Sequence, residues 1–148
     1  QLTQYIERFK ESHPQYANKT IESYAFGGGA EVTDKLADLV LNGEKQGTSS
    51  LYQLYELEAV RLPEIGEISV ILDSKGSPIV AVINTAVDIL KFKDVTDYHA
   101  NIEAEGDKSL GYWRDVHIKF FGSLCEEIEN VKFNEESLIV FETFEAIT

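Results

Sequence analysis

Apolar residues recur along the chain with two spacings, and each spacing predicts a different kind of element. A spacing of three or four residues places side chains on one side of a helix, whereas a spacing of two places them on one face of a strand. The first spacing predicts a helix over residues 2–12, which Pro14 ends because proline cannot continue a helix. The apolar side of this helix consists of Leu2, Tyr5, Ile6 and Phe9.

Two further helices are predicted by the same spacing. One has Thr33 or Asp34 as its expected N-cap and ends at Asn42–Gly43, where glycine takes the left-handed conformation at no steric cost. The other follows Ser109, which is the expected N-cap, and carries the only cysteine, Cys125, on its buried side. We expect Cys125 to be a small core residue. The apolar side of the last helix consists of Leu110, Trp113, His117, Phe120 and Phe121.

Strands are predicted mainly in the second half of the chain. Residues 68–72 alternate between apolar and polar, and residues 74–77 form a predicted hairpin turn. Residues 79–83 are continuously apolar, so we expect a central strand that residues 87–92 extend or follow with another strand. Two other segments are predicted as strands: residues 138–144 and the start of residues 49–59, which then enters a helix.

This order of elements predicts an α+β fold. The helices flank the strands without a repeating strand–helix–strand rhythm, so we expect a small mixed or antiparallel sheet that curls towards a β-barrel. The chain has 148 residues, which fits one domain of ordinary size, and no linker or internal repeat divides it. We therefore expect one domain over residues 1–148, with the helix of about residues 1–13 packed on it.

The net charge of −13, from 13 basic and 26 acidic residues, narrows the classes of partner. Nucleic acids are bound largely by lysine and arginine, so the composition disfavours a broad nucleic-acid surface, and we expect no DNA partner. A small molecule entering a pocket fits this charge better. No segment has the length and apolarity of a membrane span, and the first residues show no secretion signal, so we expect no membrane partner and a cytoplasmic location. Nothing in the sequence indicates an oligomeric state.

The loop Gly43–Thr48 is the first candidate for chemistry. Lys45 can act as a base only where burial or a neighbouring cation lowers its pKa, and Thr48 is the hydroxyl that it would activate. Residue types alone favour the plainer alternative, a solvated lysine beside a threonine in a turn.

The acidic stretch Glu103–Asp107, which includes Glu105, is the second candidate. Three carboxylates within five residues repel one another, which is typical of an acid–base site, a metal site or a solvated loop. The nearest histidines, His99 and His117, give no known metal-site spacing with these acids, so we predict no metal and no other cofactor.

Trp113, Arg114 and His117 form the third candidate. Trp113 and His117 share one side of the last predicted helix, an arrangement more typical of core packing than of a ligand site. Arg114 points elsewhere, where it is suited to an acidic partner or a phosphate.

Four segments, in this order along the chain, resemble the ASCH domain family and in particular a bacterial subgroup of short members. The first contains Gly43, Lys45 and Thr48 in the family's Gly-x-Lys-x-x-Thr signature. The others are residues 62–70, 103–107 and 109–117. The resemblance runs from about Phe26 to the end of the sequence. It implies a PUA-like fold, in which a small β-barrel and its flanking helices enclose a cleft.

The resemblance also implies a set of site residues. The family is associated with RNA binding and some members cleave RNA, whereas a small relative removes the acetyl group of N4-acetylcytidine with a lysine, a threonine and a glutamate. Carried over to this sequence, the lysine is Lys45, the base, and the threonine is Thr48, the nucleophile. The glutamate, as proton carrier or substrate orienter, is Glu103 or Glu105, and the order His-Ala-x-x-Glu that starts at His99 favours Glu103.

Ser50 is a departure from the family pattern, because many members have an arginine two residues after the threonine. This weakens an interpretation of the loop as a grip for RNA. We keep Ser50 as a candidate substrate-binding residue, together with Trp113, Arg114 and His117. The expected function is an amidohydrolase acting on a small acylated nucleoside or a related amide. The alternative is a module that binds or cleaves RNA.

Overall fold

The structure, a computed structural model, describes all of residues 1–148. The α-helices are α1 (Leu2–Ser12), α2 (Ala30–Leu41), α3 (Tyr52–Glu58), α4 (Asp97–Glu103) and α5 (Leu110–Glu126). Two short 3₁₀ helices are η1 (Pro14–Tyr16) and η2 (Phe92–Asp94). The strands are β1 (Ile21–Ala25), β2 (Gly47–Leu51), β3 (Ile68–Leu72), β4 (Pro78–Lys91) and β5 (Leu138–Ile147).

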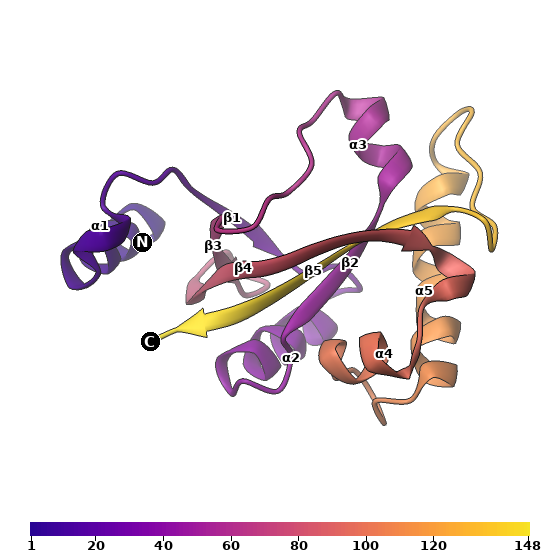
Figure 1. The fold of residues 1–148 in the computed structure, drawn as a ribbon. Coiled ribbons are helices and arrows are strands. Elements are labelled where there is room, and N and C mark those ends of the chain that lie inside the picture. Colours follow the sequence, from indigo (N-terminus) through magenta and orange to yellow (C-terminus); the bar gives the residue numbers. More distant parts are fainter.

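All the strands belong to one mixed sheet with the order β1-β3-β4-β5-β2. Only β1 and β3 pair in parallel, and the other neighbours are antiparallel. The two long strands β4 and β5 run side by side through the middle of the molecule (Figure 1). The sheet curls but stays open, because β1 and β2 are its two edges. The predicted α+β class with a curled mixed sheet is therefore confirmed.

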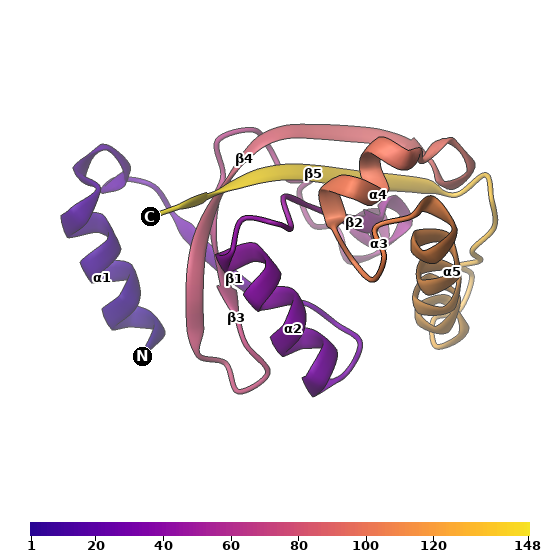
Figure 2. The same cartoon turned by 90° about the horizontal axis from the view of Figure 1, so that it is seen from below.

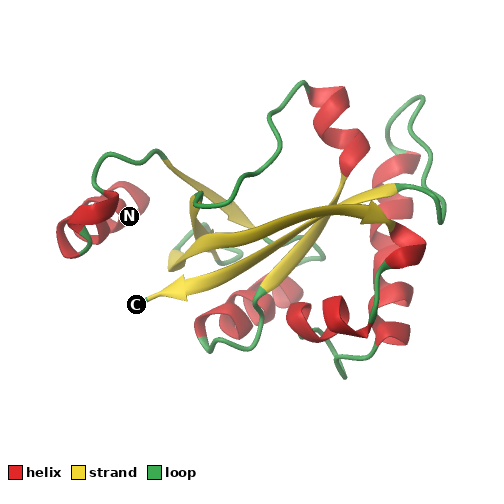
Figure 3. Ribbon diagram, viewed as in Figure 1, coloured by secondary structure: helices red, strands yellow, loops and turns green.

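The helices lie around the sheet rather than within it (Figure 3). Helix α1 lies at one end of the molecule and α5 at the other, with α2 between them when the molecule is seen from below (Figure 2). Each contributes to a separate apolar cluster. Phe9 of α1 packs with Val70 of β3, Val40 of α2 packs with Phe144 of β5, and Trp113 of α5 packs with Leu51 of β2. No helix of the chain combines the length and the apolarity that crossing a membrane requires.

Several elements agree with the sequence analysis. Helix α1 has the predicted bounds, and the Ser109 hydroxyl caps α5 by accepting from the Tyr112 N–H at 3.1 Å. The segment after residue 47 is a strand that enters a helix, as expected. Strand β4 is continuous to Lys91, so residues 87–91 extend it, with a bulge between Asn84 and Ala86.

Two details of the helices differ from the sequence analysis. Helix α2 begins at Ala30 rather than after Thr33, because Gly29, with a φ of 95°, lets the chain enter the helix earlier. Thr33 lies inside the helix and its hydroxyl donates to the Phe26 carbonyl. Helix α4 was not predicted, because a helix this short shows no clear apolar periodicity. Thr96 and His99 form its capping box.

Candidate active site

A cleft of about 1100 Å³ lies against the sheet, between α2, α3 and α5. Its walls are rich in aromatic side chains, namely Tyr24, Phe26, Tyr55, Tyr112, Phe120 and Phe121. The acidic residues that border it are Glu22, Glu31, Glu67, Glu103, Glu105 and Glu142. The basic residues are Lys35, Arg61 and Lys119. The cleft is thus an aromatic cavity in which carboxylates outnumber cations.

Lys45 is the most deeply buried charged residue beside the cleft, with none of its side chain exposed. The chain reaches it by leaving α2 through Gly43, which has a φ of 80°, and the Lys45 N–H then donates to the Leu39 carbonyl. Its ammonium donates to the Glu103 carbonyl oxygen at 3.3 Å, to Glu103 Oε1 at 3.1 Å and to Glu105 Oε2 at 3.0 Å. Burying an ammonium without hydrogen-bond partners would strongly destabilise the fold, and these three bonds offset that cost.

Glu103 is the last residue of α4, and its carboxylate is the group that the other buried polar side chains around Lys45 contact. In addition to Lys45, its carboxylate accepts from the Ser49 hydroxyl at 2.8 Å and from Trp113 Nε1 at 2.7 Å, and His117 Nε2 lies 3.8 Å away. Burial raises the pKa of Glu103, but the Lys45 ammonium, His117 and the Trp113 N–H outweigh it and lower this pKa to about 2. Glu103 is therefore a fixed carboxylate.

Glu105 behaves in the opposite way although it shares the same ammonium. Burial and the neighbouring Glu103 carboxylate raise its pKa above the ordinary value, and the attraction of Lys45 only partly opposes them. Two neighbouring carboxyl groups whose pKa values move apart are a common acid–base arrangement, in which one stays ionised and the other carries the proton. Glu105 borders the cleft, so a ligand bound there can contact its carboxyl group.

The contacts of Lys45 favour a protonated ammonium, whereas the family resemblance implies that Lys45 is a base. Burial lowers the pKa of Lys45, but the carboxylates of Glu103 and Glu105 more than compensate, and the pKa lies above its ordinary value. An ammonium that donates three hydrogen bonds has no lone pair to accept a proton. Lys45 is also absent from the residues that border the cleft. In this state it anchors two carboxylates and cannot act as a general base.

Thr48 and Ser49 are separated by the alternation of strand β2. Ser49 faces Glu103, so it joins the buried cluster, which sequence analysis missed and strand alternation alone could have indicated. Thr48 points to the other face, where it borders the cleft opposite Glu142 of β5. The hydroxyls of Ser49 and Ser50 bond to Glu103 and Tyr55, whereas the Thr48 hydroxyl makes no hydrogen bond within the chain.

The candidate substrate-binding residues divide into two groups. Ser50, whose hydroxyl shares a 2.8 Å hydrogen bond with Tyr55, and His117, whose Nδ1–H donates to the Trp113 carbonyl at 2.8 Å, both border the cleft. Trp113 is only 1% exposed and acts on the cleft through Glu103. Arg114 lies outside the cleft and donates to the Lys93 carbonyl at 3.2 Å, so the structure does not bring it together with the other candidates.

Glu103, Glu105 and His117 each offer a ligand atom, and these atoms lie within 4.8 Å of one another. Such a set could hold a divalent cation on geometry alone. The Lys45 ammonium already provides the positive charge at both carboxylates, and a metal ion beside it would be repelled. We therefore assign these residues to the ion-pair cluster.

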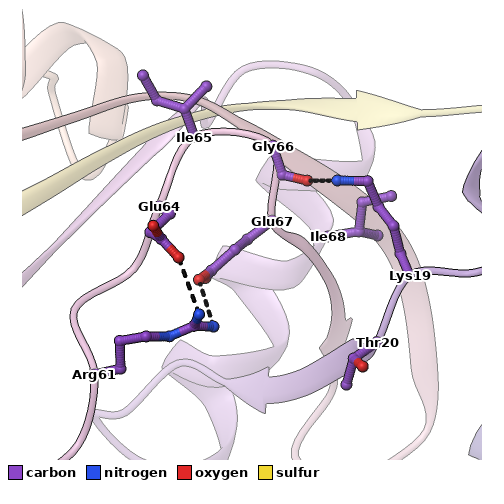
Figure 4. Close-up of a pocket in the computed structure, with 8 residues that line it drawn as sticks. All are labelled: Lys19, Thr20, Arg61, Glu64, Ile65, Gly66, Glu67 and Ile68. Atoms are coloured by element: carbon purple, nitrogen blue, oxygen red, sulfur yellow. Dashed lines mark hydrogen bonds and ion pairs between the residues drawn. The ribbon is translucent and has the colours of Figure 1, made fainter.

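A second, smaller hollow of about 300 Å³ lies where the loop before β3 meets the segment after η1 (Figure 4). Its charged groups are already paired. Lys19 donates to the Gly66 carbonyl at 2.7 Å, and Arg61 lies 3.0 Å from Glu64 and 3.3 Å from Glu67. Arg61 is paired with carboxylates, Lys19 is bonded to a backbone carbonyl, and both are exposed, so this hollow is not the candidate site.

Comparison with known proteins gives a consistent picture. A sequence model of the ASCH domain matches residues 22–148. The crystal structure of an ASCH domain from Lactobacillus crispatus JV V101 is similar, with a TM-score of 0.91 and 28% identity, over 97% of this chain and 92% of that one. A protein from Enterococcus faecalis V583 has a TM-score of 0.86 and 25% identity, over 99% and 90%. No curated protein matches the sequence. Because the family model covers most of the length, the chain belongs to the ASCH domain family.

Proposed function

We propose that the cleft hydrolyses an amide bond in a small, uncharged, nucleoside-like molecule. The observation that carries this proposal is the free hydroxyl of Thr48 in a cleft that also holds a carboxylate, Glu103, and a carboxyl group with a raised pKa, Glu105. A nucleophile and a proton donor in the same cavity are the two groups that amide hydrolysis requires.

In the proposed reaction, Thr48 Oγ attacks the amide carbonyl carbon and gives up its proton. The C–N bond then breaks, and Glu105 donates its proton to the departing nitrogen. This leaves the acyl group as an ester on Thr48 and an amine as the first product. In the second half of the reaction the hydroxyl group of a water molecule bonds to the acyl carbon and the other proton of that water returns to Glu105. The bond from Thr48 Oγ to the acyl carbon breaks, a carboxylic acid leaves, and Oγ regains the proton that it gave up. Lys45 keeps its proton throughout and holds Glu103 and Glu105 at 3.1 and 3.0 Å.

The class of substrate follows from the walls of the cleft. Aromatic side chains such as Tyr55, Tyr112 and Phe120 offer faces on which a planar heterocycle can stack. The excess of glutamates over basic residues repels a phosphorylated ligand, so a nucleoside fits the charge better than a nucleotide. The volume of about 1100 Å³ is at the upper end for a small-molecule site and is ample for a nucleoside.

The test is hydrolysis of N4-acetylcytidine and related small amides by the purified protein. Thr48→Val removes the hydroxyl with little change in shape and should abolish turnover. Glu105→Gln removes the proton and should slow it by a factor on the order of 10² or more. The matched control is Thr85→Val, because Thr85 is exposed on β4 and does not border the cleft. Turnover that is unchanged in Thr48→Val would rule out this mechanism.

The alternative function, binding or cleavage of RNA, has less support. A site that tracks a phosphate backbone needs a continuous basic groove, whereas here Lys35, Arg61 and Lys119 are dispersed among glutamates. The alternative would gain support if single-stranded RNA bound at low salt with an affinity that fell steeply as salt was added. Absence of binding at low salt would eliminate it.

A further inference from the structure

Glu142 and Thr48 face each other across two paired strands. In the antiparallel register of β2 and β5, Thr48 is the direct Cα partner of Glu142. Directly opposed residues project to the same face of the sheet with Cβ atoms about 4.5–5.5 Å apart. Both residues border the cleft. The carboxylate and the hydroxyl are thus within reach of proton transfer, either directly or through one water molecule.

Only one of the two carboxylate oxygens of Glu142 accepts a hydrogen bond within the chain. Asn84 Nδ2 donates to its Oε1 at 3.0 Å, whereas its Oε2 makes no hydrogen bond within the chain. Asn84 is itself 7% exposed, lies at the bulge in β4, and has a second contact at 3.4 Å with the Glu64 carbonyl. A buried amide therefore orients the carboxylate and leaves one of its oxygens free for the cleft.

The proposed reaction needs a group that accepts the proton of Thr48, and the three ionisable groups of the Lys45 cluster are engaged in other contacts. Lys45 is an ammonium with three acceptors. Glu103 accepts hydrogen bonds from Lys45, Ser49 and Trp113. Glu105 is the proton donor of the reaction. Of the other carboxylates that border the cleft, Glu142 is the one paired directly with Thr48 across the two strands.

We propose that Glu142 is the general base for Thr48 and that Asn84 is the residue that positions it, an assignment that rests on Thr48 being the nucleophile of the proposed function. In this step the Thr48 Oγ–H bond breaks, its proton goes to Glu142 Oε2, and the Oγ lone pair forms a bond to the acyl carbon. Glu142 later returns the proton when water has released the acyl group.

The surroundings of Glu142 suit this role. Burial and the Glu67 carboxylate raise its pKa above the ordinary value, although the Asn84 hydrogen bond opposes them. The other titratable groups that face it are the phenols of Tyr24 and Tyr55, whose own pKa values it helps to raise. A base is most effective when its pKa approaches the working pH.

The experiment uses p-nitrophenyl acetate, which needs no leaving-group proton and therefore reports on Thr48 and its base alone. The Thr48 oxygen forms an ester with the acetyl group and p-nitrophenolate departs. Acetylation of the peptide that contains Thr48 is followed by mass spectrometry as a function of pH. The variant is Glu142→Gln, and the matched control is Glu145→Gln, an exposed glutamate on the same strand. Asn84→Ala tests the positioning residue.

Three results are expected. Acetylation of wild-type Thr48 rises in the weakly acidic range, where a carboxyl group with a raised pKa ionises, rather than near the ordinary lysine value of about 10.4. Glu142→Gln slows it by a factor on the order of 10² or more, and Glu145→Gln does not. Asn84→Ala moves the midpoint to higher pH, because it removes the hydrogen bond that lowers the pKa of Glu142.

Equal acetylation in wild type and Glu142→Gln would overturn the assignment, as would a wild-type midpoint in the lysine range or no acetylation of Thr48 at any pH. The outcome for the amide substrate is separate. If Thr48 is acetylated in a Glu142-dependent way while N4-acetylcytidine stays intact, the proposed substrate fails and the assignment of Glu142 stands.

Discussion

Replacing Lys45 by methionine should destabilise the protein strongly, because methionine fills a similar volume but leaves two carboxylates without a cation. The side chains of Lys45 and Glu103 are 0% and 2% exposed. Removal of one partner from a buried ion pair typically costs about 3–5 kcal/mol. For a chain of this length, that corresponds to a fall in Tm of roughly 6–20 °C. The expected loss is a large share of the roughly 5–15 kcal/mol that stabilises a typical domain.

The deficit of the Lys45→Met variant should also depend on pH. In the wild type the pKa of Glu103 is lowered to about 2, so its contribution is complete above the ordinary value of 4.5 and is lost as pH falls towards 2. In the variant, burial acts without Lys45 and raises this pKa above the unfolded value. Folding then takes up a proton, so the variant loses stability as pH rises. The difference in unfolding free energy between the two proteins should be larger at pH 7 than near pH 4, and it should become small only as pH approaches 2.

Thermal and urea unfolding at both pH values measure this difference. Lys75→Met, at an exposed lysine in the hairpin turn, is the control and should change stability by no more than about 0.5 kcal/mol. The double variant Lys45→Met with Glu103→Gln should recover part of the loss at pH 7, because it removes the stranded charge. A Lys45→Met variant as stable as the wild type at pH 7 would refute the buried ion-pair cluster.

Three further predictions concern single positions. Glu142→Gln should raise Tm at pH 7 but not at pH 4. The pKa of Glu142 is higher in the folded state than in the unfolded state, so ionisation of Glu142 destabilises the fold as pH rises between these two values. Thermal melts in which the Tm difference between variant and wild type is the same at both pH values would contradict this. Ser109→Ala should cost about 1 kcal/mol in urea unfolding through loss of the α5 cap. Gly47→Ala should destabilise by about 1–3 kcal/mol in the same assay, because a Cβ there lies 2.6 Å from Ile102 and 3.1 Å from the Glu142 carbonyl oxygen.

The fold was predictable wherever a local pattern matched the final environment. The apolar stripe of residues 2–12, the Ser109 cap and the apolar run of residues 79–83 each match an observed element, because packing and local preference favour the same state. Helix α4 was not predicted because its seven residues are too few to show an apolar periodicity. The start of α2 differed because Thr33 bonds back to the Phe26 carbonyl from inside the helix instead of capping it.

The sequence identified several residues of the candidate site but not the chemical role of each. Lys45, Glu103 and Glu105 meet in the structure, whereas the family resemblance offered Glu103 and Glu105 as alternatives. The role of Lys45 could not be inferred from residue types, because its protonation depends on two carboxylates that lie 58 and 60 residues further along the chain. Sequence analysis did not identify Glu142 as a candidate for a similar reason, because its position opposite Thr48 is fixed by the pairing of β2 with β5.

The sequence by itself determined the class of fold, because periodicity and capping act over a few residues and need no knowledge of distant partners. It also determined that the chain is acidic and that its signature loop holds a lysine and a threonine. Only the tertiary structure decided which face of β2 each hydroxyl occupies, that the pKa values of Glu103 and Glu105 move apart, and that Lys45 is buried between them. These properties arise from burial and from charges brought together across the sheet, and a linear sequence carries neither.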